Sequence, residues 1–252
     1  MGRLIDADAF VKELCGISKH YSPREIWSDW VVMLAIAISQ RVDYLQSRED
    51  LYKNISAKYS GEELESFCKL NALYFEMVEG KQFQDLLGHL YMQLDMGNNK
   101  TGQFFTPYHI SQMVAGLYQE DDIKKDLREK GWASVMDPAC GGGSLLIAMA
   151  ERLHNDGVQY QKKVIFIGQE LSFVTACSAY IQMSMNGMPG AIVVGDTLHE
   201  PFDEDLLNLV VDREKHENVW ITPMYFSDEI TSLRFIKTVG RYLRDERQRR
   251  SD

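Results

Sequence analysis

The stretch ASVMDPACGGGS, residues 133–144, decides the fold of this chain. Its first four residues form a short apolar run that predicts a β-strand ending at Asp137. Three glycines follow, and residues 144–157 have helical apolar spacing. A glycine cluster between a strand and a helix lets a ligand approach the backbone, and the helix start favours an anionic group. A tight strand-to-helix turn without a ligand explains the three glycines equally well.

The sequence around this stretch alternates between strand and helix patterns. Further apolar runs cover residues 164–168 and 191–194, with a weaker run at 218–221, and amphipathic segments separate the first three runs. Continuous apolar runs are typical of parallel strands covered on both faces. Residues 1–95 look helical almost throughout, and Gly and Asn residues mark a connector near residue 100. We therefore predict an α/β fold with two domains, a helical one at 1–100 and a second at 101–252.

Composition excludes several classes of function. Lys and Arg total 27 against 37 Asp and Glu, so the formal net charge is −10, which argues against indiscriminate coating of nucleic acid. The four cysteines lack zinc-site spacing, and we expect no metal. The longest apolar run is far shorter than the roughly 20 residues that cross a bilayer. Without a signal-peptide pattern at the start, we expect a cytoplasmic protein that does not contact a membrane.

Three acidic residues follow the first three predicted strands, namely Asp137, Glu170 and Asp196. The carboxyl ends of parallel strands meet at one edge of a sheet, where open α/β folds bind ligands. An acid directly before the glycine loop repels a phosphate and suits an amino acid, while Glu170 can accept both hydroxyls of a ribose. Asp196 can accept a hydrogen bond from an adenine amino group. Each acid alone is explained by a solvated loop or a helix cap, but three in register favour a ligand site.

Two motifs carry a family resemblance. DPACGGGSLLIA, residues 137–148, resembles the first motif of S-adenosyl-L-methionine-dependent DNA adenine methyltransferases, and GQFFTPYHI, residues 102–110, resembles the segment that precedes it. The combination is most similar to the methylase (modification) subunit of type I restriction systems. The resemblance covers residues 85–200 well. It implies a Rossmann-like methyltransferase sheet, here shortened, because few residues follow the fourth predicted strand.

The resemblance also implies roles for individual residues. Asp137 and the glycine-loop backbone would hold the methionine moiety of S-adenosyl-L-methionine, and Phe105 with its neighbours would close over it. Glu170 would hold the ribose, with Leu171 beside the adenine and Asp196 at the adenine amino group. The cofactor-binding residues predicted in this way are Phe105, Thr106, Pro107, Asp137, Pro138, Ala139, Gly141, Gly143, Glu170, Leu171 and Asp196.

The catalytic motif of this family does not occur in the sequence in its usual form. The family carries Asn, Asp or Ser, then two prolines and an aromatic residue, after the fourth strand; no such run occurs here. The nearest candidate is Thr222-Pro223-Met224-Tyr225. Thr222 and Pro223 would accept hydrogens of the adenine amino group, and Tyr225 would stack on the flipped-out base. An ordinary strand end with a proline turn is the alternative. If the catalytic alignment holds, Thr222→Asn should raise methyl transfer.

The predicted function is transfer of a methyl group from S-adenosyl-L-methionine to N6 of adenine in double-stranded DNA. The system would be of restriction-modification type, with specificity or restriction subunits as partners. The alternative is a subunit that binds the cofactor and assembles the complex but is impaired in catalysis. The position of Thr222 discriminates between them. A methyltransferase acting on protein glutamine is a third possibility, against which the FFTP segment and the helical N-terminal region weigh.

Overall fold

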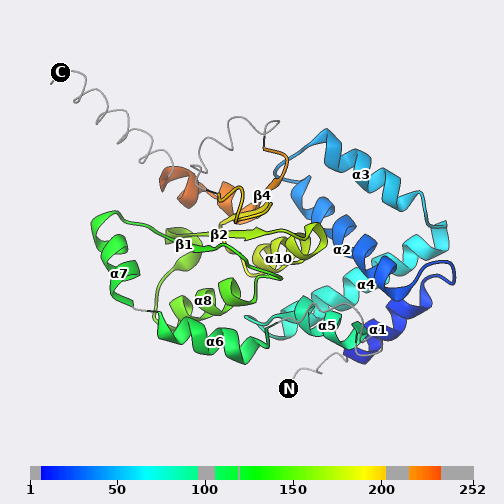
Figure 1. The fold of residues 1–252 in the computed structure, drawn as a ribbon, viewed down its shortest axis with the longest axis horizontal. Helices are drawn as coiled ribbons and strands as arrows, with labels where there is room; N and C mark the ends of the chain where they lie inside the picture. Colours follow the sequence, from blue (N-terminus) through cyan, green and yellow to red (C-terminus); the bar gives the residue numbers. More distant parts are fainter. Residues whose placement is uncertain (1–6, 96–105, 119, 203–215, 234–252) are drawn as a thin grey trace.

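The α/β class predicted from the sequence is confirmed by the computed structural model, which describes residues 7–95, 106–118, 120–202 and 216–233 (Figure 1). In this part of the chain, four strands form one sheet in the order β1-β2-β3-β4. The first three are parallel, and the fourth is antiparallel to its neighbour. The strands are β1 (Ala133–Asp137), β2 (Val164–Glu170), β3 (Gly190–Val194) and β4 (Val219–Ile221).

Helices of the crossover connections cover one face of the sheet, the lower face in Figure 1. α8 (Ser144–Asn155) packs against β1, and α10 (Phe173–Met185) packs against β2 and β3. α6 (Tyr108–Leu117) packs against α8, so these helices form one layer. Two further helices in this half of the chain are α7 (Glu120–Glu129), which contacts β1, and the short α9 (Tyr160–Lys163).

Five helices lie within residues 7–95, and two of them begin at a serine N-cap. Ser22 and Ser60 each accept a hydrogen bond from the backbone of the glutamate three residues later, whose side chain bonds back to the cap. These reciprocal bonds satisfy amide groups that a helix start leaves open. The helices are α1 (Ala7–Gly16), α2 (Pro23–Ser39), α3 (Gln46–Ser56), α4 (Gly61–Gly80) and α5 (Leu86–Asp95).

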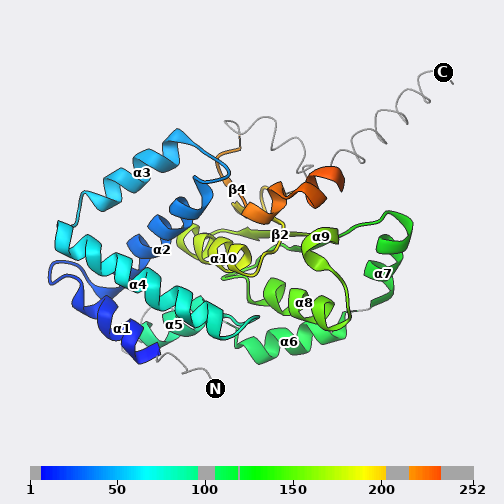
Figure 2. The same ribbon diagram turned by 180° about the vertical axis from the view of Figure 1, so that it is seen from behind.

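The N-terminal helices and the sheet share one hydrophobic core. α2 is apolar around most of its circumference, because it packs on α10 as well as on its own neighbours. Figure 2 shows these two helices side by side from behind. The predicted boundary near residue 100 falls among residues 96–105, outside the described ranges, so the division into two domains stays a prediction.

The upper face of the sheet carries a smaller apolar cluster. Ala191, Val193 and Ile221 pack there with Tyr225 from the short 3-10 helix η2 (Pro223–Phe226). Within the described residues β1 pairs only with β2, so its other side is an edge of the sheet.

The N-terminal helices contact β4 through a buried arginine. Arg48 of α3 reaches across the core, and its guanidinium lies 3.9 Å from the ring centroid of Trp220. The same group donates to the carbonyl oxygen of Val219 at 2.7 Å and pairs with Asp43 at 3.2 Å. A buried guanidinium is stable only with such partners, so these contacts anchor β4 to the helices.

Candidate functional site

The acids that end β1 and β2 lie at one edge of the sheet, together with the end of β3. Asp137 is level with Gly168 of β2, and Glu170 is level with Val194 of β3. Because the three strands are parallel, their carboxyl ends face the same side. We call this edge the carboxyl rim, defined by Asp137, Glu170 and the residues that follow each strand.

The glycine loop at the rim has a backbone that only glycine adopts readily. Gly141 and Gly143 have φ angles of 54° and 89°, in the left-handed region. A Cβ atom at Gly141 would meet nothing within 4 Å, so this part of the loop borders open space. α8 begins directly after Gly143, and the unpaired N–H groups of its first turn therefore lie at the loop.

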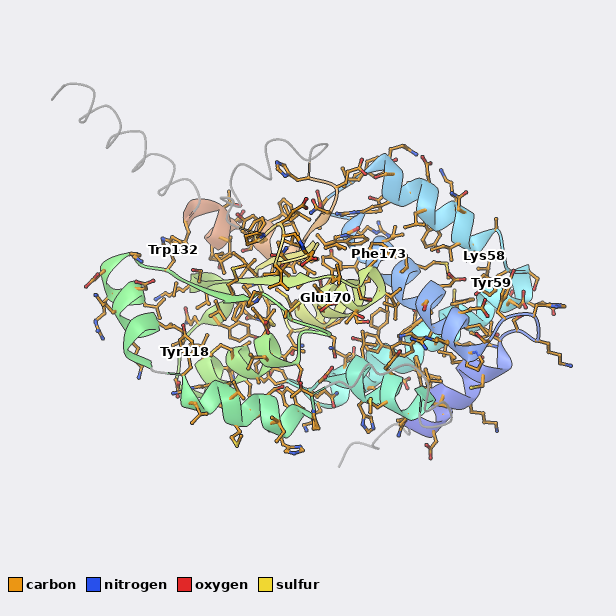
Figure 3. All side chains as sticks on the ribbon, viewed as in Figure 1. Lys58, Tyr59, Tyr118, Trp132, Glu170 and Phe173 are labelled. Atoms are coloured by element: carbon orange, nitrogen blue, oxygen red, sulfur yellow. The ribbon has the colours of Figure 1, made fainter. Side chains whose placement is uncertain are left out.

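Glu170 connects the loop to the start of α10. Its two carboxylate oxygens accept hydrogen bonds from the backbone N–H groups of Gly141 at 3.0 Å and Ser172 at 2.8 Å. Figure 3 shows Glu170 at the end of β2, with Phe173 at the adjoining start of α10. An ionised carboxylate has about four acceptor positions, so Glu170 can still bind the hydroxyls of a ligand.

Asp137 ends β1 and directly precedes the glycine loop. One of its oxygens accepts a hydrogen bond from the backbone N–H of Ala139 at 3.1 Å. Burial raises the pKa of Asp137, and the negative charge of Glu170 raises it further, while the Ala139 bond acts in the opposite direction. Two neighbouring carboxylates of this kind favour a positively charged ligand, because a cation relieves their repulsion.

Asp196 follows β3, and its side chain is 41% exposed. It accepts from the N–H of Leu198 at 2.9 Å and lies 2.7 Å from Nδ1 of His199, and these contacts lower its pKa, that with His199 most. The hydroxyl of Thr197 donates to the carbonyl oxygen of Pro138, which joins this loop to the glycine loop. The structure therefore brings Asp137, Glu170 and Asp196 to one rim, as the sequence predicts.

Apolar side chains accompany the acids. Leu171 is 69% exposed and Leu198 is 91% exposed. Leu171 directly follows Glu170, where the family resemblance expects an adenine ring, and its cofactor role stays a prediction.

The FTP segment is only partly described. Phe105 lies outside the described residues, while Thr106 and Pro107 are exposed at the start of α6. One turn further along, the hydroxyl of Ser111 lies 2.8 Å from that of Ser144, the first residue of α8. This contact holds the start of α6 beside the glycine loop, which is the side that the resemblance requires.

The structure does not bring the predicted catalytic residues to the carboxyl rim. The sequence expectation places Thr222, Pro223 and Tyr225 at the rim, after a fourth strand that runs with the others. β4 instead runs antiparallel to β3, so Thr222 lies beside Gly190, at the start of β3. Gly190 and the rim residue Val194 are separated by about 13 Å of strand.

Thr222 is also fully buried and hydrogen bonded. Its hydroxyl donates to the carbonyl oxygen of Met188 at 2.7 Å and accepts from the N–H of Gly190 at 3.0 Å. Tyr225 is buried in the apolar cluster above the sheet and offers no face to a base. The expected geometry is therefore wrong, and Thr222 instead fixes the junction between β3 and β4.

Two candidate functional residues were not predicted from the sequence. Gln182 and Asp85 are buried and bond to each other directly behind the glycine loop. A long polar residue on the buried side of an otherwise apolar helix, FVTACSAYIQMSM, was the available signal for Gln182. No comparable signal distinguishes Asp85 from an ordinary acid before a helix.

Among the described residues, no group of three or more His, Cys, Asp or Glu side chains is arranged to hold a metal ion. No helix in the described ranges combines the length and apolarity that crossing a bilayer requires.

Comparison with known proteins identifies the family. The model of the family described as N-6 DNA Methylase matches residues 82–248, more than half of the chain. The chain belongs to the N-6 DNA methylase family. The match covers the glycine loop, the three acids and the FTP segment, so it confirms the family resemblance seen in these motifs.

Curated relatives come from Methanocaldococcus jannaschii. The type I restriction enzyme MjaVIII methylase subunit is 28% identical over 132 residues, which cover 51% of this chain and 20% of the relative. The MjaVII methylase subunit is 29% identical over 105 residues, covering 40% of this chain and 16% of the relative. The matched part of the chain thus spans about a fifth of the length of these relatives.

Two solved structures are also similar. A putative class I S-adenosylmethionine-dependent methyltransferase from Listeria monocytogenes is 16% identical with a TM-score of 0.39, covering 92% of this chain and 80% of that one. The methyltransferase subunit of a type I restriction-modification system from Streptococcus thermophilus is 23% identical with a TM-score of 0.39, covering 73% and 42%.

Proposed function

We propose that this chain forms the cofactor-binding part of a DNA adenine-N6 methyltransferase that works in a restriction-modification-type system. The observation that carries the proposal is the rim itself, where Asp137 and Glu170 flank a glycine loop in a chain of the N-6 DNA methylase family. The relatives named as type I restriction enzyme methylase subunits support the same system.

The residues at the rim fit S-adenosyl-L-methionine. When bound, this cofactor supplies an electrophilic methyl group on a positively charged sulfur. The paired acids Asp137 and Glu170 match its positive charges, and the open backbone at Gly141 leaves room for it. Glu170 would accept the ribose hydroxyls through lone pairs that its backbone bonds leave open.

The remaining residues at the rim would orient the ligand. The first turn of α8 presents unpaired N–H groups, which suit the carboxylate of the methionine end. Asp196 would accept from the adenine amino group, and Leu171 would shield the ring from water. Thr106 and Pro107, with Phe105, would cover the methionine end from the side of α6.

The substrate would be an adenine flipped out of double-stranded DNA. Its amino group is a weak nucleophile, because the nitrogen lone pair is delocalised into the ring, and it needs acceptors that draw on its hydrogens. With Thr222 at the opposite edge, that acceptor would come from polypeptide outside the described residues. Within the described residues the free side of β1 adjoins Asp137, so a parallel strand added there would end at the same rim.

A second candidate function is a cofactor-binding and assembly subunit without its own methyl transfer. The burial of Thr222 and Tyr225 favours it for residues 1–252 taken alone. Both candidates place the chain in a cytoplasmic complex with DNA and with specificity or restriction subunits.

Calorimetric titration with S-adenosyl-L-methionine tests the common part of both candidates. We expect saturable binding that Asp137→Ala abolishes, because the acid facing the methionine end is lost. Asp126→Ala is the matched control, since Asp126 pairs with Lys130 at 2.8 Å on α7. Equal binding by the Asp137 variant and the unchanged protein would contradict the proposal.

A labelled-methyl assay on mixed DNA separates the two candidates. The methyltransferase candidate predicts incorporation when a specificity partner is present, and the assembly candidate predicts none with or without it. Binding of the cofactor in the first experiment is common to both.

A further inference from the structure

A cluster of buried polar groups lies behind the glycine loop, where α5, α8 and α10 meet. Its central side chains are Gln182 of α10, which is 1% exposed, and Asp85, which is 7% exposed and directly precedes α5. Asp85 belongs to the N-terminal helices, whereas Gln182 belongs to the sheet region. The inference drawn from this cluster rests on the proposed function, because it concerns the same cofactor site.

Every polar group of Gln182 is used. Its Nε2 donates to an oxygen of Asp85 at 2.8 Å and to the carbonyl oxygen of Gly142 at 2.8 Å. Its Oε1 accepts from the backbone N–H of Leu87 at 3.0 Å. A single amide therefore links the start of α5 to the middle of the glycine loop.

Asp85 is held in place on the opposite side of this amide. The same oxygen also accepts from the backbone N–H of Gly88 at 3.0 Å. A Cβ atom at position 88 would overlap the Asp85 carboxylate, so glycine at this position leaves room for the acid. The pocket around Asp85 is thus shaped to hold this side chain.

A carboxylate in such a place is costly for the fold. Burial raises the pKa of Asp85, although the bonds from Gln182 and Gly88 act in the opposite direction. Apolar residues of similar volume commonly stabilise a core as well as a buried charge does, or better. Stability alone therefore does not explain an acid here, whereas a role in setting the loop conformation does.

We propose that Asp85 and Gln182 are positioning residues of the cofactor site, which hold Gly142 and thereby the loop backbone in the conformation that binds S-adenosyl-L-methionine. Asp85 orients the Gln182 amide, and the amide fixes the Gly142 carbonyl. The N-terminal helices are thereby part of the cofactor site without touching the ligand.

A second tether acts on the same loop from α6. The hydroxyl groups of Ser111 and Ser144 lie 2.8 Å apart and are buried at the first residue of α8. The loop is thus held at Gly142 by the N-terminal helices and at Ser144 by α6. Removal of Asp85 or Gln182 should loosen the attachment at Gly142.

The test compares three substitutions by calorimetric titration with S-adenosyl-L-methionine. Asp85→Ala and Gln182→Leu remove the attachment, and we expect each to weaken binding about tenfold, because the lost hydrogen bonds would lower the population of the loop conformation that binds by about that factor. Asp85→Asn keeps an acceptor for Gly88 and Gln182, so it should bind within about threefold of the unchanged protein.

Asn71→Leu is the matched control. Asn71 accepts a hydrogen bond from Nε1 of Trp30 at 2.8 Å among the N-terminal helices, so its loss also leaves a donor without a partner. We expect a lower melting temperature with unchanged affinity. If affinity falls in the control as much as in Asp85→Ala at equal loss of stability, the role is merely structural and the proposal is wrong.

Hydrogen exchange gives a readout that needs no cofactor. In the ligand-free protein, amides of residues 140–144 should exchange faster in Asp85→Ala than in Asp85→Asn or Asn71→Leu. Unchanged exchange and unchanged affinity in both attachment variants would overturn the inference. If the unchanged protein fails to bind the cofactor at all, the proposed function fails instead, whatever the exchange shows.

Discussion

The carboxyl rim and the opposite end of the sheet, where β3 begins, use their polar groups differently. At the carboxyl rim, Glu170 keeps acceptor positions beyond its two backbone bonds, and the loop at Gly141 borders open space. At the opposite end, Thr222 is fully buried, and its hydroxyl is hydrogen bonded to Met188 and Gly190. A polar side chain with capacity left over is suited to a ligand, whereas one that is fully used serves the fold.

After the loss of binding expected for Asp137→Ala, the largest effect is expected from Glu170→Ala at the rim. The variant loses the bonds to the ribose and leaves the amides of Gly141 and Ser172 without their acceptor, so affinity for S-adenosyl-L-methionine should fall about 100-fold. Calorimetric titration measures this. Glu229→Ala, which removes an exposed pair with Lys162, is the control. If the affinity of the Glu170 variant changes by less than about threefold, the proposal that the rim binds the cofactor is wrong.

The next effect is a dependence of affinity on pH. Burial, together with the charge of Glu170, raises the pKa of Asp137, so this acid takes up a proton at a higher pH than an ordinary aspartate. A cationic ligand needs the ionised form. Affinity should therefore fall as pH decreases through this raised pKa, by up to about tenfold per pH unit.

Titrations across a pH series, on the unchanged protein and on Asp137→Asn, check this sign. The variant has no charge to lose at position 137, so its weaker binding should vary less with pH in the same range. An affinity that rises on acidification would show that no ionised carboxylate faces the ligand.

Substitution of Thr222 should affect stability and leave the rim alone. Thr222→Val removes the hydroxyl that bridges Met188 and Gly190, which should lower the free energy of unfolding by about 1–3 kcal/mol. Affinity for the cofactor should not change. Thr222→Asn should destabilise the fold and give no gain in methyl transfer, in contrast to the expectation from sequence. Denaturant unfolding measures the stability, and the labelled-methyl assay measures the transfer. A gain in methyl transfer with Thr222→Asn would show that Thr222 belongs to the catalytic site.

The smallest effect is expected at Gly141. The φ of 54° is in the left-handed region, so Gly141→Ala costs about 1–2 kcal/mol of backbone strain although space for the Cβ is available. Gly16→Ala is the control, because its Cβ also meets nothing within 4 Å and its backbone is not left-handed. Thermal unfolding should separate the two variants, and equal melting temperatures would show that the loop carries no strain.

The rim was predictable because it depends on local features. Each parallel strand is a short apolar run followed by an acid, and parallel strands end on the same side. The glycine loop, the helix starts at Ser22 and Ser60 and the family motifs are likewise visible in consecutive residues.

The direction of β4 was not predictable in the same way. The strand has three residues, and its apolar pattern is the same in either direction. Its placement depends on Arg48, which is 171 residues away from Val219 in the sequence. The link between Asp85 and Gln182 is also long-range, since the two residues are 97 positions apart in the sequence. Contacts of this kind arise from the packing of separate helices, and the sequence near each residue does not specify its partner.

A crystal structure of the chain with bound S-adenosyl-L-methionine tests the central claim most directly. We predict the methionine end against Gly141–Gly143 and Asp137, with the ribose hydroxyls on Glu170 and Thr222 still buried beside Gly190. A ligand bound away from the carboxyl rim, or a rim that stays empty at saturating cofactor, would contradict the account.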